Sequence, residues 1–401
     1  MARTEYGSLG SLRDHNRRRV LEELQRRGTA SRADLARITG LSRSTISSLV
    51  GELQDSGLVV ETAPNGGDRG HAQGRPPVLL TLDRRAGAIV GIDFGHADVR
   101  VAVADLSRTI LAERARDIDV DHAGTAALDA AAELVIDALG EASIPRDRVL
   151  AAGMGISGLV DHEKDLVHRS AILPSWADIR PGAEMHSRLG VPVFIENDAN
   201  LGAMAEVALG AAKGVQNAIY LMIAAGIGAG VVVDGRIIHG VAGTAGELGH
   251  VLVDDNGPIC RCGNRGCLET LAAGPAIVEL LARTHGPSLS LAQVLELVEQ
   301  EDPGALRAVA DAGRAVGRAL AALVNVLNPE AIVIGGELAA AGDALLEPIR
   351  AAIGRYAIPS AADDVRVVQS PLGGRAEVLG ALILAAHRAD VPDFTQEKAV
   401  L

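Results

Sequence analysis

The chain has 401 residues, a formal net charge of −13, and aromatic residues that make up only 2% of its composition. This length exceeds one ordinary hydrophobic core, so we expect two or three domains. Apolar runs stay below about 18 residues and no apolar leader precedes a cleavage site, which argues against membrane spanning and secretion. Three cysteines fit a reducing cytoplasm and exclude a disulfide-rich scaffold.

The charge is unevenly distributed along the chain. The first 80 residues hold 12 arginines, no lysine and 9 acidic residues, a net charge of +3, whereas the remainder carries −16. A small basic module therefore precedes a large acidic one. Because arginine favours forked contacts to phosphate or guanine, the first module is a candidate for nucleic-acid binding.

Three short helices are predicted near the N-terminus. Residues 11–28 carry an apolar stripe that includes Leu24 and end at a glycine, which is typical of an amphipathic helix. Ser31 can cap a second helix that ends at Gly40, and a third helix begins near Ser42.

The third helix has one apolar face and one small polar face. Ile46, Leu49 and Leu53 point inward at helical spacing, whereas short hydroxyl side chains and Arg43 point outward. Such a surface permits close approach to bases in the major groove, as in a helix-turn-helix. The alternative is a capped surface helix in a small bundle. The residues expected to contact DNA here are Arg32, Ser42, Arg43, Ser44, Thr45 and Ser47.

A hairpin is predicted to follow these helices. Residues 58–62 and 78–82 read as strands, and the glycine-rich loop between them carries Arg69 and Arg75. Three helices followed by a hairpin indicate a winged helix, whose loop arginines could reach a minor groove or phosphates. We therefore predict a DNA-binding domain over residues 11–82.

Two turns and one strand end mark the second module. Residues 88–106 read as two strands joined by a turn, and a second glycine-rich turn lies within residues 221–230. Between them, a buried strand over residues 190–197 ends in a polar cluster that includes Asp198. A carboxylate at this place can accept a ligand hydroxyl. A helix cap is the alternative role of Asp198.

One stretch contains all the cysteines. Cys260, Cys262 and Cys267 lie among glycines that permit tight turns, and His250 precedes them. Three thiolates and one imidazole complete a tetrahedral shell with no position left for water, so we predict a structural zinc ion. Reduced core cysteines are the alternative, although this polar setting is unlike an apolar core.

The last third of the chain alternates between helices and strands. An alanine-rich helix over residues 305–327 precedes a buried strand and turn at 329–336, and helices extend to about Arg388. We expect this part to close a second α/β lobe. Residues 389–401 are predicted to be a loose C-terminal tail.

The cysteine run and the preceding Gly246-Glu247-Leu248-Gly249-His250 resemble the signature of the ROK family of repressors, open reading frames and sugar kinases. The resemblance extends from about Arg13 to about Arg388. It implies a winged helix-turn-helix followed, over residues 88–388, by a two-lobed α/β domain of the actin-like ATPase and sugar kinase type, with a zinc loop beside a sugar pocket.

The resemblance also implies site residues. In kinases of the family, the pair matching Asn197 and Asp198 contacts the sugar and supplies the general base, and glutamates matching Glu247 and Glu269 hydrogen-bond sugar hydroxyls. His250 would bind zinc through one nitrogen and face the sugar with the other. The implied sugar-binding set is Asn197, Asp198, Glu247, His250 and Glu269. Gly155 to Gly158 and Trp176 are candidates for the pocket wall.

The sequence departs from the kinases at both glycine-rich turns. Ala97 and Ala225 stand where the kinases have threonine hydroxyls that bind phosphate. Each lost hydrogen bond to a buried phosphate costs about 1–3 kcal/mol. We therefore expect a domain that binds a sugar or sugar phosphate without phosphorylating it, in a protein that is not an enzyme.

The resulting prediction is a sugar-responsive transcriptional regulator, a repressor that binds operator DNA as a homodimer or homotetramer in the cytoplasm. An ATP-dependent sugar kinase with an attached DNA-binding domain is the main alternative. A DNA-binding protein without a small-molecule ligand is a third possibility, which the polar cluster around Asp198 and Glu247 disfavours.

Overall fold

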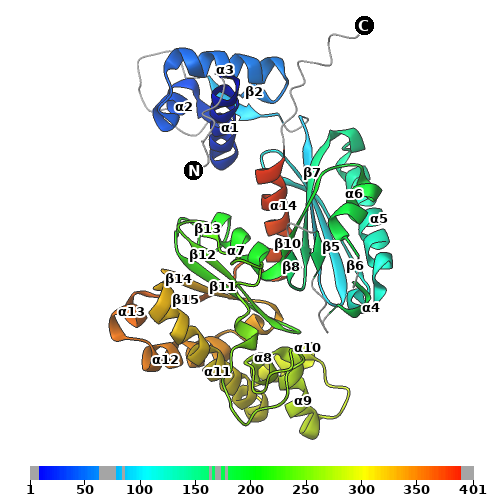
Figure 1. The fold of residues 1–401 in the computed structure, drawn as a ribbon, viewed down its shortest axis with the longest axis vertical. Helices are drawn as coiled ribbons and strands as arrows, with labels where there is room; N and C mark the ends of the chain where they lie inside the picture. The colour runs from blue at the N-terminus through cyan, green and yellow to red at the C-terminus, as the bar shows by residue number, and fades with distance from the viewer. Residues whose placement is uncertain are drawn as a thin grey trace.

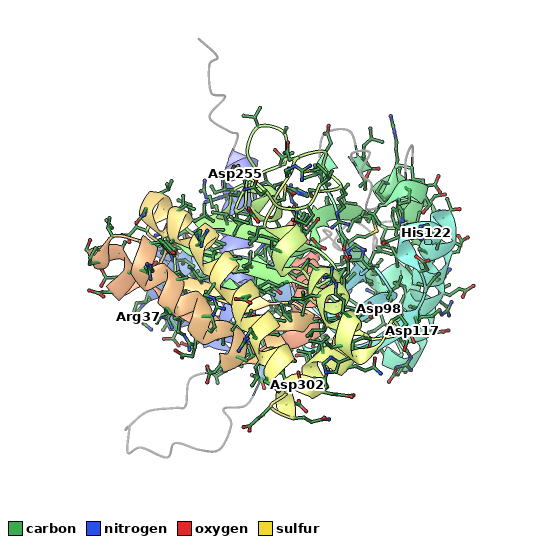
Figure 2. The ribbon with its side chains drawn as sticks, turned by 90° about the horizontal axis from the view of Figure 1, so that it is seen from below. Arg37, Asp98, Asp117, His122, Asp255 and Asp302 are labelled. Atoms are coloured by element: carbon green, nitrogen blue, oxygen red, sulfur yellow. The ribbon has the colours of Figure 1, made fainter. Side chains whose placement is uncertain are left out.

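The computed structural model arranges the chain as a winged helix, a first α/β lobe and a second α/β lobe along its long axis (Figure 1). Polar side chains such as Arg37 and His122 extend from its surface (Figure 2). No helix in the described part of the chain is long and apolar enough to cross a membrane. The structure describes residues 9–62, 78–83, 86–161, 165–167, 173–176 and 179–389.

The winged helix has the predicted helices and hairpin. Ser31 caps the second helix through the Asp34 backbone N–H, Gly40 ends it at a φ of 69°, and Ser42 caps the third helix. A short strand before the second helix adds to the hairpin, giving the sheet order β1-β3-β2. The loop arginines Arg69 and Arg75 lie outside the described residues. The elements are α1 (Leu9–Arg27), β1 (Ala30–Ser31), α2 (Arg32–Thr39), α3 (Arg43–Asp55), β2 (Val59–Thr62) and β3 (Leu79–Leu82).

The first lobe is built on a five-stranded sheet of order β10-β7-β4-β5-β6. Strands β7 and β10 run parallel to β4, whereas β5 and β6 form an antiparallel meander from it. Alternate residues of the buried strand β4 face two different cores, which the lobe's helices cover. The strands are β4 (Ala88–Phe94), β5 (Asp98–Asp105), β6 (Ile110–Asp117), β7 (Val149–Ile156), β8 (Val160–Asp161), β9 (Leu166–Val167) and β10 (Val193–Asn197). The helices are α4 (Val120–Ala123), α5 (Thr125–Ala142), α6 (Pro181–Leu189) and α7 (Asp198–Ala208).

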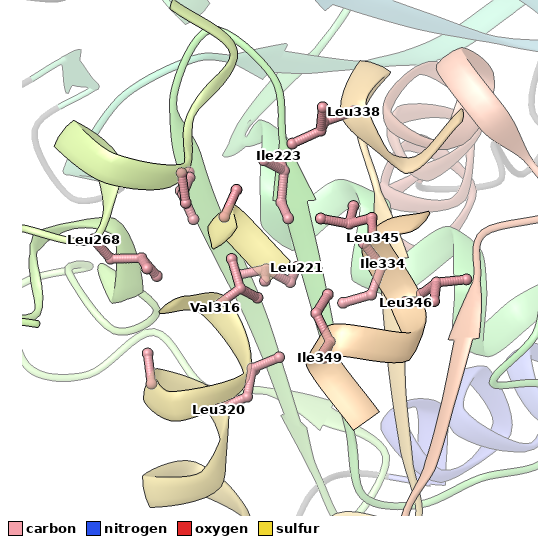
Figure 3. Packing of buried hydrophobic residues seen from close by; sticks show 14 of the residues in the cluster. Leu221, Ile223, Leu268, Val316, Leu320, Ile334, Leu338, Leu345, Leu346 and Ile349 are labelled. Carbon is pink, nitrogen blue, oxygen red and sulfur yellow. The ribbon is translucent and has the colours of Figure 1, made fainter. Parts of the chain in front are cut away.

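The second lobe repeats this plan with the sheet order β13-β12-β11-β14-β15. Leu221 of β11 and Ile334 of β14 pack against Val316 and Leu320 of the long helix α11 and against Ile349 of α12 (Figure 3). The strands are β11 (Ala218–Ile223), β12 (Ile227–Val233), β13 (Arg236–Ile237), β14 (Ala331–Gly335) and β15 (Arg366–Gln369). The helices are α8 (Glu269–Ala272), α9 (Gly274–His285), α10 (Leu291–Glu299), α11 (Pro303–Leu327), α12 (Asp343–Tyr356) and α13 (Pro359–Asp364).

Two expectations for the last third of the chain were wrong. The segment after residue 336 is not all helical, because β15 pairs in parallel with β14 at the sheet edge. The final helix, α14 (Ala376–Arg388), does not complete the second lobe. It packs on the first lobe's sheet and on α7, because glycines on both sides allow the backbones to approach closely. The predicted tail from Asp390 onward lies outside the described residues.

Helix α14 links all three units. At its N-terminal end, Glu377 accepts a hydrogen bond of 2.8 Å from the hydroxyl of Tyr220 in the second lobe. Further along, Leu379 and Ile383 belong to the same apolar cluster as Leu58 and Leu82 of the winged helix. Helix α14 therefore takes part in a contact with the second lobe and in the apolar cluster that includes winged-helix residues.

Candidate functional site

A cavity of about 320 Å³, lined by both polar and apolar residues, lies between the two lobes. The first lobe contributes the end of β7 and the junction of β10 with α7, and the second contributes the β11–β12 turn and the loop that carries the cysteines. All the residues of the predicted sugar-binding set line this cavity: Asn197, Asp198, Glu247, His250 and Glu269.

Asn197 and Asp198 have separate roles at the start of α7. The Asn197 side chain caps the helix by accepting the Asn200 N–H and donates to the Gly158 carbonyl at 3.0 Å. Asp198 therefore does not serve as the N-cap. Its carboxylate accepts the Ser157 hydroxyl at 2.6 Å and the Ala199 N–H at 2.7 Å. Burial raises the pKa of Asp198, and the hydrogen bond from Ser157 opposes that shift.

Glu247 lies on the opposite wall of the cavity, just before a short 3₁₀ turn over Leu248–His250. Burial raises the pKa of Glu247 to about 7, and the negative charges of Asp198 and Glu269 add to this shift. Near neutral pH, this carboxyl group is therefore present in both forms, and it can donate or accept a hydrogen bond.

Glu269 is buried and paired with Arg261. Arg261 donates to both of its oxygens, each at 2.8 Å, and the Ile227 N–H lies 3.3 Å from Oε2. Arg261 also lines the cavity, although its sequence pattern did not predict this role. Its place between Cys260 and Cys262 is the signal that could have drawn attention to it.

The three cysteines and His250 form the predicted cluster. Their candidate ligand atoms all lie within 4.8 Å of one another. His250 Nδ1 is 3.5 Å from Cys260 Sγ, and the sulfurs of Cys262 and Cys267 are 3.6 Å apart. Bond lengths of about 2.0–2.3 Å in a tetrahedral shell place ligand atoms about 3.3–3.8 Å apart, so both of these pairs have the spacing of ligands around one metal ion. His250 Nε2 points the other way, 3.7 Å from Glu247.

His96 was not predicted from the sequence as a cavity residue, whereas Ser157 belongs to the predicted wall segment Gly155 to Gly158. Ser157 and His96 line the cavity, and the Nδ1 atom of His96 lies 2.8 Å from Asp121. Trp176 does not line it, contrary to expectation, because its ring packs edge-on against Phe94 within the first lobe's core. The Trp176 indole N–H donates to the Val120 carbonyl at 2.9 Å. Of the predicted wall segment Gly155 to Gly158, only Ser157 and Gly158 line the cavity.

The two glycine-rich turns lie where the sequence placed them. Ala97 is in the turn between β4 and β5, and Ala225 is in the turn between β11 and β12. The neighbours of Ala225, Ala224 and Gly226, line the cavity. Asp93, at the end of β4, is buried, and burial and nearby carboxylates raise its pKa well above the usual value.

The winged helix presents the expected polar surface. Arg43, Ser44 and Ser47 are exposed on α3. The hydroxyl of Ser42 is engaged in capping, because it accepts the Thr45 N–H at 3.1 Å. Arg32 contacts Gln54 and Glu61 at 2.9 and 3.2 Å, so its side chain already has partners within the domain.

These features define a class of protein, in which a winged helix-turn-helix precedes a sugar-kinase-like domain with a Cys3His cluster beside its interlobe cavity. The family model described as the ROK family matches residues 89–388, and one described as winged helix-turn-helix DNA-binding matches residues 13–60. The chain belongs to the ROK family.

The chain is similar both to repressors and to sugar kinases. It is 32% identical over 381 residues to the xylose repressor of Bacillus spizizenii, covering 94% of this chain and 96% of that protein. The glucokinase of Thermotoga maritima is 32% identical over 315 residues, covering 75% of this chain and 98% of the kinase. The crystal structure of a ROK family transcriptional regulator, a homologue of Escherichia coli Mlc, superposes with a TM-score of 0.79 at 28% identity, covering 96% and 98% of the two chains.

Proposed function

We propose that this protein is a sugar-responsive transcriptional repressor. Its winged helix binds operator DNA, and its interlobe cavity binds a sugar or sugar phosphate as an effector. The observation that carries the proposal is the convergence of the predicted polar side chains on one cavity in a chain that also has a winged helix. The repressor relatives cover both parts of the chain, whereas the glucokinase covers 75% of it.

The chemistry of the cavity suits a polyol. Asp198 presents a carboxylate at the start of α7, and Glu247 can donate or accept near neutral pH. Glu269 is fixed by Arg261, and Asn197 is held as the helix cap. A sugar offers several hydroxyl groups that both donate and accept, so convergent fixed acceptors of this kind select its orientation.

The Cys3His cluster is proposed to hold a structural zinc ion. Soft thiolates and an imidazole in tetrahedral proximity are the donor set that zinc prefers. The ligands would be His250, Cys260, Cys262 and Cys267. Bound zinc would fix the loop that carries Arg261 and orient His250 toward Glu247, and four protein ligands leave no position for a reacting water.

We infer that the domain does not phosphorylate its ligand. Methyl groups at Ala97 and Ala225 supply no hydrogen bond to phosphate. The alternative is a sugar kinase with an attached DNA-binding domain, and the 32% identity to a glucokinase supports it. An ADP-release assay over a panel of pentoses and hexoses decides between them. Turnover at about 1–100 per second, the usual kinase range, would overturn the proposal.

Effector binding would act through lobe closure. Asp198 is the first residue of α7, and α7 packs against α14. Helix α14 also contacts the second lobe and belongs to the apolar cluster that includes winged-helix residues. A sugar that binds one closure state more tightly than the other shifts the protein toward that state. The resulting change in DNA affinity is limited by the difference between the sugar's affinities for the two states. Two operator half-sites call for a homodimer or homotetramer, acting in the cytoplasm.

Isothermal titration calorimetry tests the ligand directly. We expect one sugar or sugar phosphate from the panel to bind the metal-loaded protein, and Asp198→Asn to weaken that binding about 10-fold or more. Asp311→Asn on the exposed face of α11 is the matched control and should leave affinity unchanged. Failure of every panel member to bind the wild-type protein would contradict the proposed effector site.

A further inference from the structure

We propose that Arg261 is a positioning residue through which the metal cluster sets the geometry of the effector site. This inference rests on the proposed function, because it assigns Arg261 the task of holding Glu269 for the sugar. Arg261 is the residue between two of the candidate ligands, Cys260 and Cys262, and its side chain lines the cavity. It therefore belongs to both sites.

The contact between Arg261 and Glu269 is bidentate. Arg261 Nε lies 2.8 Å from Oε1 of Glu269, and a terminal guanidinium nitrogen lies 2.8 Å from Oε2. The Glu269 side chain is 10% exposed and that of Arg261 is 32% exposed. A forked pair of this geometry fixes the plane of the carboxylate as well as its position, which a single hydrogen bond does not do.

The β11–β12 turn holds the pair from the other side. A Cβ atom built on Gly226 would lie 2.9 Å from both the Arg261 guanidinium and Glu269 Oε2, so the ion pair rests directly on this glycine. The Ile227 N–H lies 3.3 Å from the same carboxylate oxygen. Glu269 is thus held between the arginine of the cysteine loop and the backbone of the turn.

A metal ion in the Cys3His cluster would fix the backbone position of Arg261. The Asn264 carbonyl accepts the Cys260 N–H at 2.7 Å, and the Cys260 carbonyl accepts the Gly263 N–H at 2.9 Å, which closes a tight turn around residue 261. With both flanking sulfurs bound to one ion, the backbone of Arg261 is fixed on each side. Loss of the ion frees both neighbours and removes this constraint.

The charge on Arg261 has a second effect. Glu247 and Asp198 also line the cavity, so Glu269 is one of three carboxyl groups in a confined space. Arg261 compensates one of these charges. Its removal would leave Glu269 as an uncompensated, largely buried carboxylate beside the other two, and the side chain would move toward solvent.

Arg265 provides a matched control in the same loop. Its guanidinium donates to the Gly257 carbonyl at 2.8 Å and it does not line the cavity. Substitution of Arg265 by glutamine removes one positive charge from the same loop, as Arg261→Gln does, but leaves the contacts of Glu269 intact. A difference between Arg261→Gln and Arg265→Gln therefore reports the contact and not the net charge of the loop.

The first arm of the test uses the zinc-loaded, full-length protein. Metal content is measured by mass spectrometry and sugar affinity by calorimetry. We expect Arg261→Gln to retain one zinc ion per chain and to lose sugar affinity about 10-fold or more, whereas Arg265→Gln stays within about twofold. Equal affinities for Arg261→Gln and the wild-type protein would overturn the proposal.

The second arm needs no sugar. Zinc release to a chromophoric chelator is timed for the wild-type protein, Arg261→Gln, Glu269→Gln and the double variant. We expect each single change to speed release by about 10-fold and the double variant to match the singles, because both remove one contact. Additive effects would overturn the proposal. If no sugar binds the wild-type protein, the proposed function fails, while this arm still decides the role of Arg261.

Discussion

At the scale of single residues, the run Glu196-Asn197-Asp198 shows how neighbouring side chains divide the work. Asn197 caps α7, which leaves the Asp198 carboxylate to face the cavity. Glu196 is buried behind the strand end, where its carboxylate accepts the Asn200 amide at 2.9 Å and lies 2.8 Å from His239 Nε2. The sequence allowed Asp198 to be either a helix cap or a ligand acceptor. The backbone geometry at the start of α7 makes Asn197 the cap.

The hydrogen bond from Ser157 lowers the pKa of Asp198, and this predicts how sugar affinity depends on pH. Burial raises the pKa of Asp198, so the ionised acceptor, and with it sugar affinity, is lost as pH falls through that raised pKa. Ser157→Ala removes the hydrogen bond of 2.6 Å that stabilises the ionised form. We expect calorimetry to show the midpoint of this loss at higher pH in Ser157→Ala. The control is Ser288→Ala, because Ser288 is exposed and does not line the cavity. Coincident pH profiles for the wild-type protein and Ser157→Ala would contradict this account.

The sequence predicted which polar residues gather at the cavity and in the cluster because these residues are concentrated in short runs. The cysteine cluster and the Asn197-Asp198 pair were predicted as they stand in the structure. The role of Arg261 depends on Glu269 and on the β11–β12 turn, and side-chain contacts of this kind are not visible in local sequence. Trp176 was misplaced for the same reason, because a lone tryptophan in a loop can pack inward or line a cavity.

At the scale of elements, helix caps and hydrophobic periodicity predicted the winged helix well. Strand β15 was missed because its four residues alternate only briefly and their pairing with β14 is set by distant chain segments. The same limit applies to α14. Its apolar face is evident from the sequence, but the choice between the two lobes depends on glycines in other elements that accept its backbone.

Gly380 allows α14 to contact α7. A Cβ atom at this position would lie 2.0 Å from the Leu201 carbonyl oxygen, so Gly380→Ala must separate the helices. We expect a destabilisation of about 1–3 kcal/mol in urea unfolding, the usual cost of overpacking. Gly354→Ala is the control: Gly354 lies in α12 with no atom within 4 Å of a built Cβ. It should be neutral or stabilising by about 0.5–1 kcal/mol. Equal effects of the two changes would refute close packing at α14.

Glu377 makes the stability of this element depend on pH. Burial raises the pKa of Glu377 to about 7, so the folded protein retains a proton that the unfolded chain releases at its ordinary pKa. Its contribution is therefore present at acidic pH and is lost as pH rises toward and through 7. Glu377→Gln keeps an acceptor for the Tyr220 hydroxyl without titrating. We expect this variant to gain about 1–3 kcal/mol over wild type at pH 8 but little at pH 5 in chemical unfolding. An unchanged pH dependence would argue against a titrating Glu377.

At the scale of the whole molecule, the cavity, the Cys3His cluster and the winged helix lie on connected elements. The cavity lies between the lobes, and the cysteine loop forms one of its walls. Helix α14 lies against the first lobe's sheet (Figure 1), contacts Tyr220 of the second lobe and belongs to the apolar cluster that includes winged-helix residues. Domain order was evident from the sequence, since basic and acidic modules follow one another. The connection through α14 was not, because it joins segments far apart in the chain.

This arrangement predicts that metal and effector responses fail together. Cys262→Ser replaces one candidate ligand, so we expect mass spectrometry to show zinc loss and DNA binding to lose its response to sugar in the same variant. Circular dichroism and DNA affinity without sugar check that the winged helix remains folded. An intact sugar response in a zinc-free protein would show that the cluster has no part in effector control.

Fluorescence anisotropy of labelled operator DNA tests the central claim most directly. DNA from upstream of the protein's own gene is titrated at fixed salt with wild-type protein, Asp198→Asn and Arg43→Ala, each with and without the sugar identified by calorimetry. We predict specific binding by the wild-type protein that the sugar shifts about 10-fold, binding without a sugar response in Asp198→Asn, and weak binding in Arg43→Ala. Wild-type binding that is indifferent to both DNA sequence and every sugar would contradict the proposed repressor.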